Sequence, residues 1–470
     1  MTGVPQPGGA FAQGSGPGQV WTAPVSSPLH GSAPLDATVD VPGSKSLTNR
    51  YLVLAALADA PVVLRGGLIS RDSDLMIAAL RSLGVAIESG ADAADDGAWT
   101  VTPGPLHGGV HVDCGLAGTV MRFVPPLALL AGIAGDTRPI TFDGDAGARL
   151  RPMGPLLNAL RALGATVDDG GRGTLPFTVI PPSSVPHEVD VDSSASSQFV
   201  TGLLLVAPRL PGGLTVRHVG EALPSLPHID MTCETLREAG IRVDQPDERT
   251  WIVHAGSLHF DAIRVEPDLS NAGPFMAAAL VAGGTVRIPG WPRQTTQPGA
   301  LFPELLERMG GRCKLVGDVM TVTGDGTVRG IAADLSPAGE ITPTIAALCA
   351  LASGASELTG IGHLRGHETD RLAAIATEVD RLGGACLAGD DSLKFGGAPR
   401  PGDADAGLVG AVMETYHDHR MATFAAVMGL RVPGIEVLNV GTTSKTMPEF
   451  PSMWRAMLGE PSTPGGITVA

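Results

Sequence analysis

The sequence predicts an α/β protein of two domains, each of which packs sheets around buried helices. Three observations carry this prediction: the length of the chain, a helix-end pattern that recurs six times, and two helices that are apolar on every side. A chain of 470 residues is too long for one compact core, so at least two domains are expected.

The recurring pattern is a helix that ends in a Leu- and Arg-rich turn and a glycine, usually followed by a short β-like segment. Its six copies end at Gly84, Gly164, Gly240, Gly310, Gly383 and Gly459. Glycine adopts positive φ angles without steric cost, so we expect each of these residues to terminate its helix. Single helix ends of this kind are common, but six at near-even spacing favour two domains of three α/β units each.

Two of the expected helices carry almost no polar side chains. They cover residues 272–282 and 341–352, where small and branched apolar residues follow one another without a polar face. A helix that is apolar all round is buried all round. These helices are therefore expected inside a ring of sheets.

Charge and composition exclude several classes of partner. The net charge of −16 disfavours nucleic acid, because a phosphate backbone binds to basic surfaces. No apolar run approaches the roughly 20 residues that a membrane-spanning helix needs. The five cysteines are widely spread and form neither a metal-type pair nor a disulfide framework, which is typical of the reducing cytoplasm.

Residues 1–30 differ in composition from the rest of the chain. They are rich in Gly, Pro, Ser, Gln and Ala, and such segments do not bury enough apolar surface to fold. They also lack the basic start and continuous apolar core of a secretory signal. We therefore expect a disordered and dispensable N-terminal tail.

Residues 41–50 read Val-Pro-Gly-Ser-Lys-Ser-Leu-Thr-Asn-Arg and open a helix whose first turns carry two serines and two cations. The N-terminus of a helix presents unpaired N–H groups and a partial positive charge, so anions bind there. Ser44 or Ser46 can cap this helix, and Lys45 projects from the turn. The spacing of a nucleotide P-loop is missing. Taken alone, the segment fits an anion site and an ordinary capped helix equally well.

Similar polar clusters recur at further helix starts, at residues 115–122, 149–152, 192–198, 363–371, 416–420 and 442–446. Helix capping and solvated charge explain each cluster alone. In an acidic chain, however, so many helix starts with Arg or Lys indicate a ligand with two or more phosphate or carboxylate groups. The neighbouring arginines would repel a divalent cation, so we expect no metal at His363, His367, His417 and His419.

The clusters stand in the order found in one enzyme family. Pro42-Gly-Ser-Lys-Ser-Leu-Thr-Asn-Arg50, Gly115-Leu-Ala-Gly-Thr119, Ser196-Ser-Gln198, His367-Glu-Thr-Asp-Arg371, Asp418-His-Arg420 and Lys445-Thr446 resemble the motifs of the 5-enolpyruvylshikimate-3-phosphate synthases. The resemblance runs from about residue 30 to about residue 460, and the motif variants are similar to the actinobacterial branch.

The resemblance implies a two-domain, inside-out α/β barrel, with three βαβαββ-type repeats and buried helices in each domain. Residues 43–263 would form the first domain, on the shikimate 3-phosphate side. Residues 31–42 and 264–460 would form the second domain, with the catalytic carboxylates and much of the phosphoenolpyruvate site. This family fold agrees with the repeat count.

The family transfers the enolpyruvyl group of phosphoenolpyruvate to the 5-hydroxyl of shikimate 3-phosphate and releases phosphate. The resemblance implies the same small-molecule substrates here, no cofactor, no metal, no nucleic-acid or membrane partner, and a cytoplasmic monomer. It also implies inhibition by glyphosate, which binds in the phosphoenolpyruvate site.

The resemblance also assigns roles to individual residues of this sequence. The implied shikimate 3-phosphate ligands are Lys45, Ser46, Arg50, Ser196, Ser197, Gln198, Ser225, Glu340 and His367. The implied phosphoenolpyruvate ligands are Lys45, Gly118, Arg151, Gln198, Arg371, Arg420 and Lys445. The implied catalytic residues are Glu340, Glu368 and Lys45. Addition of a hydroxyl to an enol ether needs proton removal and proton delivery, which carboxylates in different environments can divide.

The chain departs from the pattern of many bacterial members. They have Asp where Glu340 stands, Asn at Leu116 and His363, Lys at His367 and Tyr at His228. Glu340 has the same carboxylate group as Asp, on a side chain that is one methylene longer. A histidine loses its charge near neutral pH, so the contact of His367 is expected to weaken above it. Leu116 has no polar side-chain atom, so that ligand contact should be absent.

Two alternatives remain open at this point. A sister enzyme transfers enolpyruvyl to UDP-N-acetylglucosamine and usually carries a Cys, or sometimes an Asp, in the loop before the Arg151-Pro152 pair. Here residues 144–152 contain no Cys, and Ser196-Ser-Gln198 favours shikimate 3-phosphate. The other alternative is an inactive anion-binding protein, which would be expected to lack Glu340 or Glu368.

Overall fold

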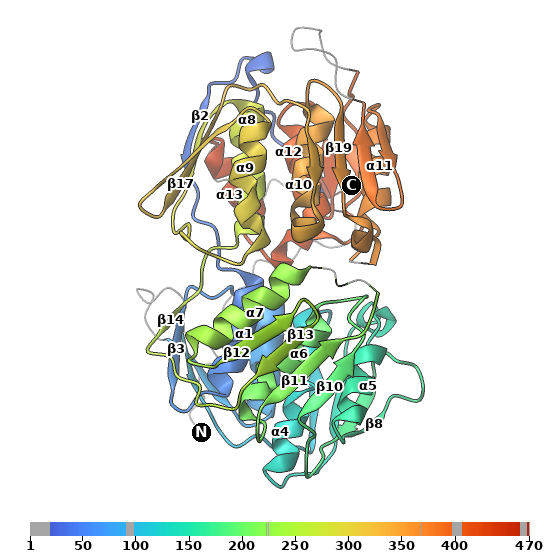
Figure 1. Cartoon of the computed structure of the whole chain (residues 1–470). Helices are drawn as coiled ribbons and strands as arrows, with labels where there is room; N and C mark the ends of the chain where they lie inside the picture. Colours follow the sequence, from blue (N-terminus) through green and yellow to red (C-terminus); the bar gives the residue numbers. More distant parts are fainter. Residues whose placement is uncertain are drawn as a thin grey trace, which may run out of the picture.

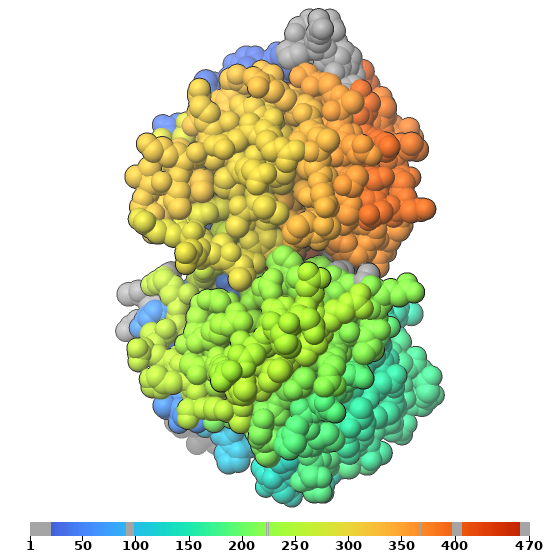
Figure 2. All heavy atoms as spheres, viewed as in Figure 1, coloured from blue at the N-terminus to red at the C-terminus, as the bar shows by residue number. Residues whose placement is uncertain are grey.

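The computed structural model describes residues 19–90, 98–221, 223, 225–366, 368–396, 407–460 and 468–469. These residues form two lobes that meet at a narrow waist, as Figures 1 and 2 show. Each lobe has its own hydrophobic core. The core of the lower lobe runs from Leu47 to Val265, and that of the upper lobe combines Trp21–Val41 with Leu269–Met457.

The lower lobe contains three sheets of four strands. The first has the order β14-β3-β5-β4, with β3 Val62–Arg65, β4 Ala86–Ser89, β5 Trp99–Thr102 and β14 Ile263–Arg264. The second is β6-β7-β9-β8, with β6 Val110–Asp113, β7 Ile140–Asp143, β8 Thr166–Asp168 and β9 Phe177–Ile180. The third is β10-β11-β13-β12, with β10 Glu188–Val191, β11 Leu214–His218, β12 Val243–Asp247 and β13 Thr250–Val253.

The upper lobe repeats this arrangement. Its first sheet is β16-β17-β15-β2, with β2 Leu35–Thr38, β15 Gly284–Ile288, β16 Arg312–Val316 and β17 Val319–Gly324. The second is β18-β19-β21-β20, with β18 Ala332–Asp334, β19 Ser356–Thr359, β20 Cys386–Ala388 and β21 Ser392–Phe395. The third is β22-β23-β1-β24, with β1 Gln19–Thr22, β22 Val412–Met413, β23 Glu436–Leu438 and β24 Thr468–Val469.

All six sheets share one pairing pattern. One edge strand pairs in parallel with its neighbour, as β6 does with β7, and the remaining two ladders are antiparallel. The same pattern links β22, β23, β1 and β24. The predicted sixfold repeat, three units in each lobe, is therefore confirmed.

The expectation of a disordered tail over residues 1–30 is wrong for its last part. Residues 1–18 lie outside the described residues, but β1 pairs antiparallel with β23 and takes the position that β9 has in its own sheet. Trp21 is 1% exposed and packs against Phe450. The chain start supplies a strand that the sixth repeat lacks, and composition alone does not reveal this.

Helices that are largely buried fill the interior of both lobes. They are α1 Lys45–Ala56, α3 Gly118–Phe123, α4 Leu127–Ile133 and α6 Gln198–Val206 below, and α8 Leu269–Ala282, α10 Thr342–Leu351 and α12 His419–Gly429 above. Every residue of α8 is buried, and so are nearly all of α10. The two helices predicted from residues 272–282 and 341–352 are thus confirmed as interior helices.

Six amphipathic helices carry the repeated Leu/Arg ends: α2 Arg71–Ser82, α5 Gly154–Ala162, α7 Leu226–Glu238, α9 Phe302–Arg308, α11 Arg371–Arg381 and α13 Phe450–Met457. All six predicted glycines have positive φ, from 75° at Gly459 to 111° at Gly84. The repeated arginine fastens the helix end to the next strand. In the lower lobe it donates to the carbonyl six residues further on, as Arg161 does to Val167 O at 3.1 Å.

The chain crosses between the lobes twice, once before α1 and once before α8. The two crossing segments hydrogen-bond to each other, because Ser44 N donates to Glu266 O and Asp268 N donates to Pro42 O, both at 2.8 Å. A Cβ on Gly43 would overlap the carbonyl oxygen of Gly66, so this close approach requires glycine. We propose that the domain boundaries fall in these two crossing segments, close to the expected 43–263. The second boundary then follows β14, so that this strand belongs wholly to the lower lobe.

No helix within the described ranges is long and apolar enough to cross a membrane.

Candidate active site

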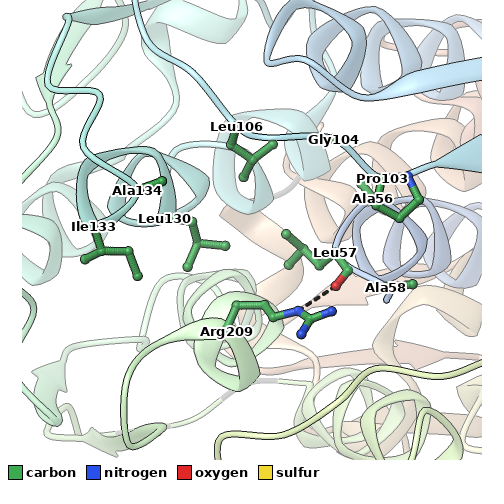
Figure 3. A pocket seen from close by; sticks show the side chains of 10 residues that line it. All are labelled: Ala56, Leu57, Ala58, Pro103, Gly104, Leu106, Leu130, Ile133, Ala134 and Arg209. Carbon is green, nitrogen blue, oxygen red and sulfur yellow. Dashed lines mark hydrogen bonds between the residues drawn. The ribbon is translucent and has the colours of Figure 1, made fainter. Parts of the chain in front are cut away.

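Two cavities among the described residues differ in chemistry. The first, of about 340 Å³, lies in the lower lobe near the ends of α1 and α4 (Figure 3). Its walls are apolar apart from Arg209, whose guanidinium donates to Leu57 O at 2.6 Å and to Asp59 Oδ1 at 2.5 Å. One arginine that is already paired is a poor match to the polyanion that the sequence predicts.

The second cavity, of about 140 Å³, lies between the lobes and has polar walls. Eleven of the predicted site residues line it: Lys45, Ser46, Arg50, Gly118, Arg151, Gln198, Glu340, Glu368, Arg371, Arg420 and Lys445. Ser196, Ser197 and Ser225 lie in the turns before α6 and α7 and are not part of this lining. His367 lies outside the described residues. The structure thus gathers most of the predicted residues from both lobes at one place.

The N-terminus of α1 opens into this cavity. Ser44 is the capping residue, and its Oγ accepts a hydrogen bond from Leu47 N at 3.4 Å. Lys45 Nζ lies 3.4 Å from Asp72 Oδ2. Burial, together with the nearby Lys445, lowers the pKa of Lys45. A lysine in this environment is a stronger acid than an exposed one.

Arg50 is almost fully buried and is held by three bonds. It donates to Ser46 O at 2.9 Å, to His228 O at 2.7 Å and to Thr232 Oγ1 at 2.9 Å. Burial lowers its pKa to about 9. A guanidinium has five N–H donors, so these bonds leave two for a ligand. Arg50 therefore serves two purposes, since it also ties α1 to α7.

Gly118 stands where two arginines converge. A Cβ at this position would lie 3.1 Å from Arg151 Nη1 and 3.3 Å from Arg122 Nη1. Arg122 is buried and donates to Pro152 O at 3.2 Å. Burial and the proximity of Arg151 lower its pKa to about 9. Arg122 belongs to the motif after Gly115, but its spacing gives no sign that it packs beside Arg151.

Glu340, in the 3₁₀ segment η5 Ser336–Ile341, has a donor on each carboxylate oxygen. His228 Nε2 lies 2.8 Å from Oε2, and Ser270 Oγ donates to Oε1 at 3.0 Å. Burial alone would raise the pKa of Glu340, but His228, Arg420 and Ser270 together hold it well below its usual range. These partners favour the ionised carboxylate although it is buried.

Glu368 lies in a dense ionic cluster. Lys445 Nζ donates to its Oε1 at 2.5 Å and Arg371 Nη2 to its Oε2 at 3.0 Å. Arg371 is fully buried and also donates to Asp418 Oδ2 at 2.7 Å. Burial alone would lower the pKa of Arg371, but Asp418 and Glu368 raise it. The cluster fixes two cations and a carboxylate on one wall of the cavity.

Further lining residues were not among the predicted ones. Asp268 accepts from Asn271 N at 3.0 Å and from Lys45 N at 3.4 Å, so one carboxylate caps α8 and joins it to α1. Burial raises its pKa. An Asp just before an apolar helix is a capping signal that the sequence does show. Burial also lowers the pKa of His419 well below its usual value, which favours the neutral ring.

The cavity as a whole carries an excess of positive charge. Its lining contains six Lys or Arg residues against three carboxylates, although the chain has a net charge of −16. Backbone N–H groups at the start of α1 add to this field. The site can hold small polyanions and exchange protons through carboxylates whose environments differ.

The fold and the cavity together define a two-lobed α/β enzyme that binds small polyanions between its lobes. The family model described as EPSP synthase (3-phosphoshikimate 1-carboxyvinyltransferase) matches residues 29–454, and the chain belongs to this family. It is therefore a transferase, and its curated relatives include enzymes of actinobacteria. The predicted family, fold and class of enzyme are confirmed.

Two curated relatives support this assignment. A 3-phosphoshikimate 1-carboxyvinyltransferase of Bifidobacterium longum is 53% identical over 453 residues, covering 93% of this chain and 98% of the relative. An enzyme of the same name from Kocuria rhizophila is 53% identical over 447 residues, covering 94% and 97%. Two EPSP synthase structures from Acinetobacter baumannii, each 24% identical, have TM-scores of 0.76 and 0.74 and cover 93% of this chain and 98% and 97% of theirs. At that identity they show the fold.

Proposed function

We propose that this chain transfers the enolpyruvyl group of phosphoenolpyruvate to the 5-hydroxyl of shikimate 3-phosphate and releases phosphate. The observation that carries the proposal is the cationic cavity between the lobes, which also holds Glu340 and Glu368. Family membership and the names of the relatives support the reaction and do not favour UDP-N-acetylglucosamine as the acceptor.

In the proposed addition step, the 5-hydroxyl oxygen bonds to the central carbon of phosphoenolpyruvate. Glu340 is the proposed acceptor of the hydroxyl proton, because it lines the cavity and a donor on each oxygen orients its carboxylate. The methylene carbon gains a proton, for which Lys45 with its lowered pKa is the proposed donor. Both groups belong to the cavity lining, one from each lobe.

In the proposed elimination step, the new methyl group loses a proton and the C–O bond to phosphate breaks. Glu368 is the proposed acceptor of that proton, because it lines the cavity and Lys445 and Arg371 hold its two oxygens in place. Arg371, Arg420 and Arg151 are the proposed clamps for the carboxylate and phosphate of phosphoenolpyruvate, since guanidinium groups bind both in bidentate fashion. Such clamps orient the two small anions for reaction.

The proposal is tested by phosphate release and calorimetry on the purified chain. We expect steady phosphate release with phosphoenolpyruvate and shikimate 3-phosphate together, and heat of binding with shikimate 3-phosphate alone. If the chain instead bound and turned over UDP-N-acetylglucosamine, the proposed acceptor substrate would be wrong. Because the cavity is built from one chain, we also propose a monomer, to be checked by light scattering.

Shikimate 3-phosphate is expected to compact the molecule. The ligand would contact Lys45 and Gln198 in the lower lobe and Glu340 and Arg371 in the upper lobe. Contacts from both lobes favour the conformation in which the lobes are together. Small-angle scattering should show a smaller radius of gyration with saturating ligand, with UDP-N-acetylglucosamine as control. An unchanged radius would contradict closure.

Gly118→Ala is expected to relieve inhibition by glyphosate at some cost in the KM for phosphoenolpyruvate. The added methyl would press on the ends of Arg151 and Arg122, which must shift by a few tenths of an ångström. Overpacking a tight site costs roughly 1–3 kcal/mol, or about one to two decades in affinity. Inhibition constants for glyphosate, measured at varied phosphoenolpyruvate, check this. A constant equal to that of the wild type would show that the inhibitor lies elsewhere.

A further inference from the structure

The imidazole of His228 contacts Glu340 across the gap between the lobes. His228 is in the first turn of α7 in the lower lobe, whereas Glu340 belongs to η5 in the upper lobe. The two side chains are 19% and 18% exposed, and 2.8 Å separates Nε2 from Oε2. Because Ser270 Oγ donates to the other oxygen, the carboxylate has one donor from each lobe.

His228 is itself held firmly by its backbone. Its carbonyl oxygen accepts hydrogen bonds from Arg50 Nη2 at 2.7 Å and from Thr232 Oγ1 at 3.0 Å. Its N–H donates to Ser225 O at 3.0 Å. The imidazole is therefore presented to Glu340 from a fixed point of the lower lobe.

We propose that His228 is a positioning residue for Glu340, which it orients toward the acceptor hydroxyl only when the two lobes are together. The proposal rests on the proposed function, in which Glu340 is the base. A glutamate side chain has three rotatable bonds, and a single donor does not fix its carboxylate. Donors from both lobes do fix it, so closure of the lobes and formation of an oriented base become one event.

The charges around the imidazole agree with this role. The helix α7 packs against α1, α6, η5 and β12. Of the residues that line the cavity with His228, α1 contributes Arg50, η5 contributes Glu340, and α6 contributes the uncharged Gln198. Loss of the imidazole removes a donor that favours the ionised carboxylate, so the pKa of Glu340 should rise. A base with a raised pKa is protonated at higher pH. The acid limb of the kcat profile should therefore move to higher pH.

The test compares His228→Ala and His228→Gln with wild type in kcat, both KM values and the pH profile of kcat. Loss of one hydrogen bond to a charged group predicts a roughly 10- to 100-fold lower kcat for His228→Ala. We expect its KM for shikimate 3-phosphate to change less than kcat. Glutamine retains an N–H donor, so His228→Gln should recover part of the lost kcat. His254→Gln is the matched control, because His254 pairs with Asp244 at 2.7 Å far from the cavity.

Two outcomes would overturn the inference. A rise in KM for shikimate 3-phosphate with unchanged kcat would make His228 a binding residue only. A fall in kcat with an unmoved acid limb and no recovery in His228→Gln would reduce its role to packing. Failure of the proposed function is a separate result, since wild-type enzyme would then not release phosphate. Thermal unfolding of each variant separates loss of fold from loss of orientation.

Discussion

Lys45→Ala is expected to abolish useful activity. Lys45 begins α1, lines the cavity and belongs to the proposed sites of both substrates. Each charge-assisted hydrogen bond that is lost costs roughly 1.5–3 kcal/mol, so two bonds predict a fall in kcat/KM of about 10²- to 10⁴-fold. The variant also leaves the buried carboxylate of Asp72 without its cation.

The measurement is kcat/KM for each substrate, with thermal unfolding to show that the variant is folded. Lys394→Ala is the matched control, because Lys394 forms an exposed ion pair with Glu357 at 3.0 Å. Exposed pairs contribute little, so this control should keep wild-type activity. Near-normal kcat/KM in Lys45→Ala would show that the motif at residues 41–50 is not part of the substrate site.

The repeat could be predicted from the sequence because its signals are local. A glycine with positive φ ends each of the six amphipathic helices, and wholly apolar segments form the interior helices. The strand at Gln19–Thr22 could not be predicted in this way. It is stabilised by pairing with β23, more than 400 residues away in the chain, and by burial of Trp21. The composition of a segment does not predict which distant strand it pairs with.

The residues of the candidate site also differ in whether a local sequence pattern could predict them. Residues such as Lys45 and Arg371 belong to motifs at helix starts, which are visible as spacing in the sequence. Asp418 was visible only as part of a motif, and its role as the buried counterion of Arg371 depends on packing between α11 and α12. The contact of His228 with Glu340 joins two lobes, so no local pattern could reveal it.

Glu340→Gln is expected to lower kcat by roughly 10²- to 10⁴-fold while both KM values change little. Glutamine has nearly the same shape, and its amide can still accept a hydrogen bond from Ser270. It cannot accept the hydroxyl proton, so the loss falls on the transition state and not on binding.

Single-turnover measurements with saturating substrates would isolate the chemical step in Glu340→Gln from binding and release. Glu304→Gln is the matched control, since Glu304 is an exposed carboxylate 3.8 Å from Arg308 on α9. We expect that control to turn over like the wild type. If the KM for shikimate 3-phosphate rose in Glu340→Gln while kcat held, Glu340 would bind the acceptor without acting as its base. His228 would then orient a ligand contact and not the catalytic carboxylate, so this measurement also bears on the contact between the lobes.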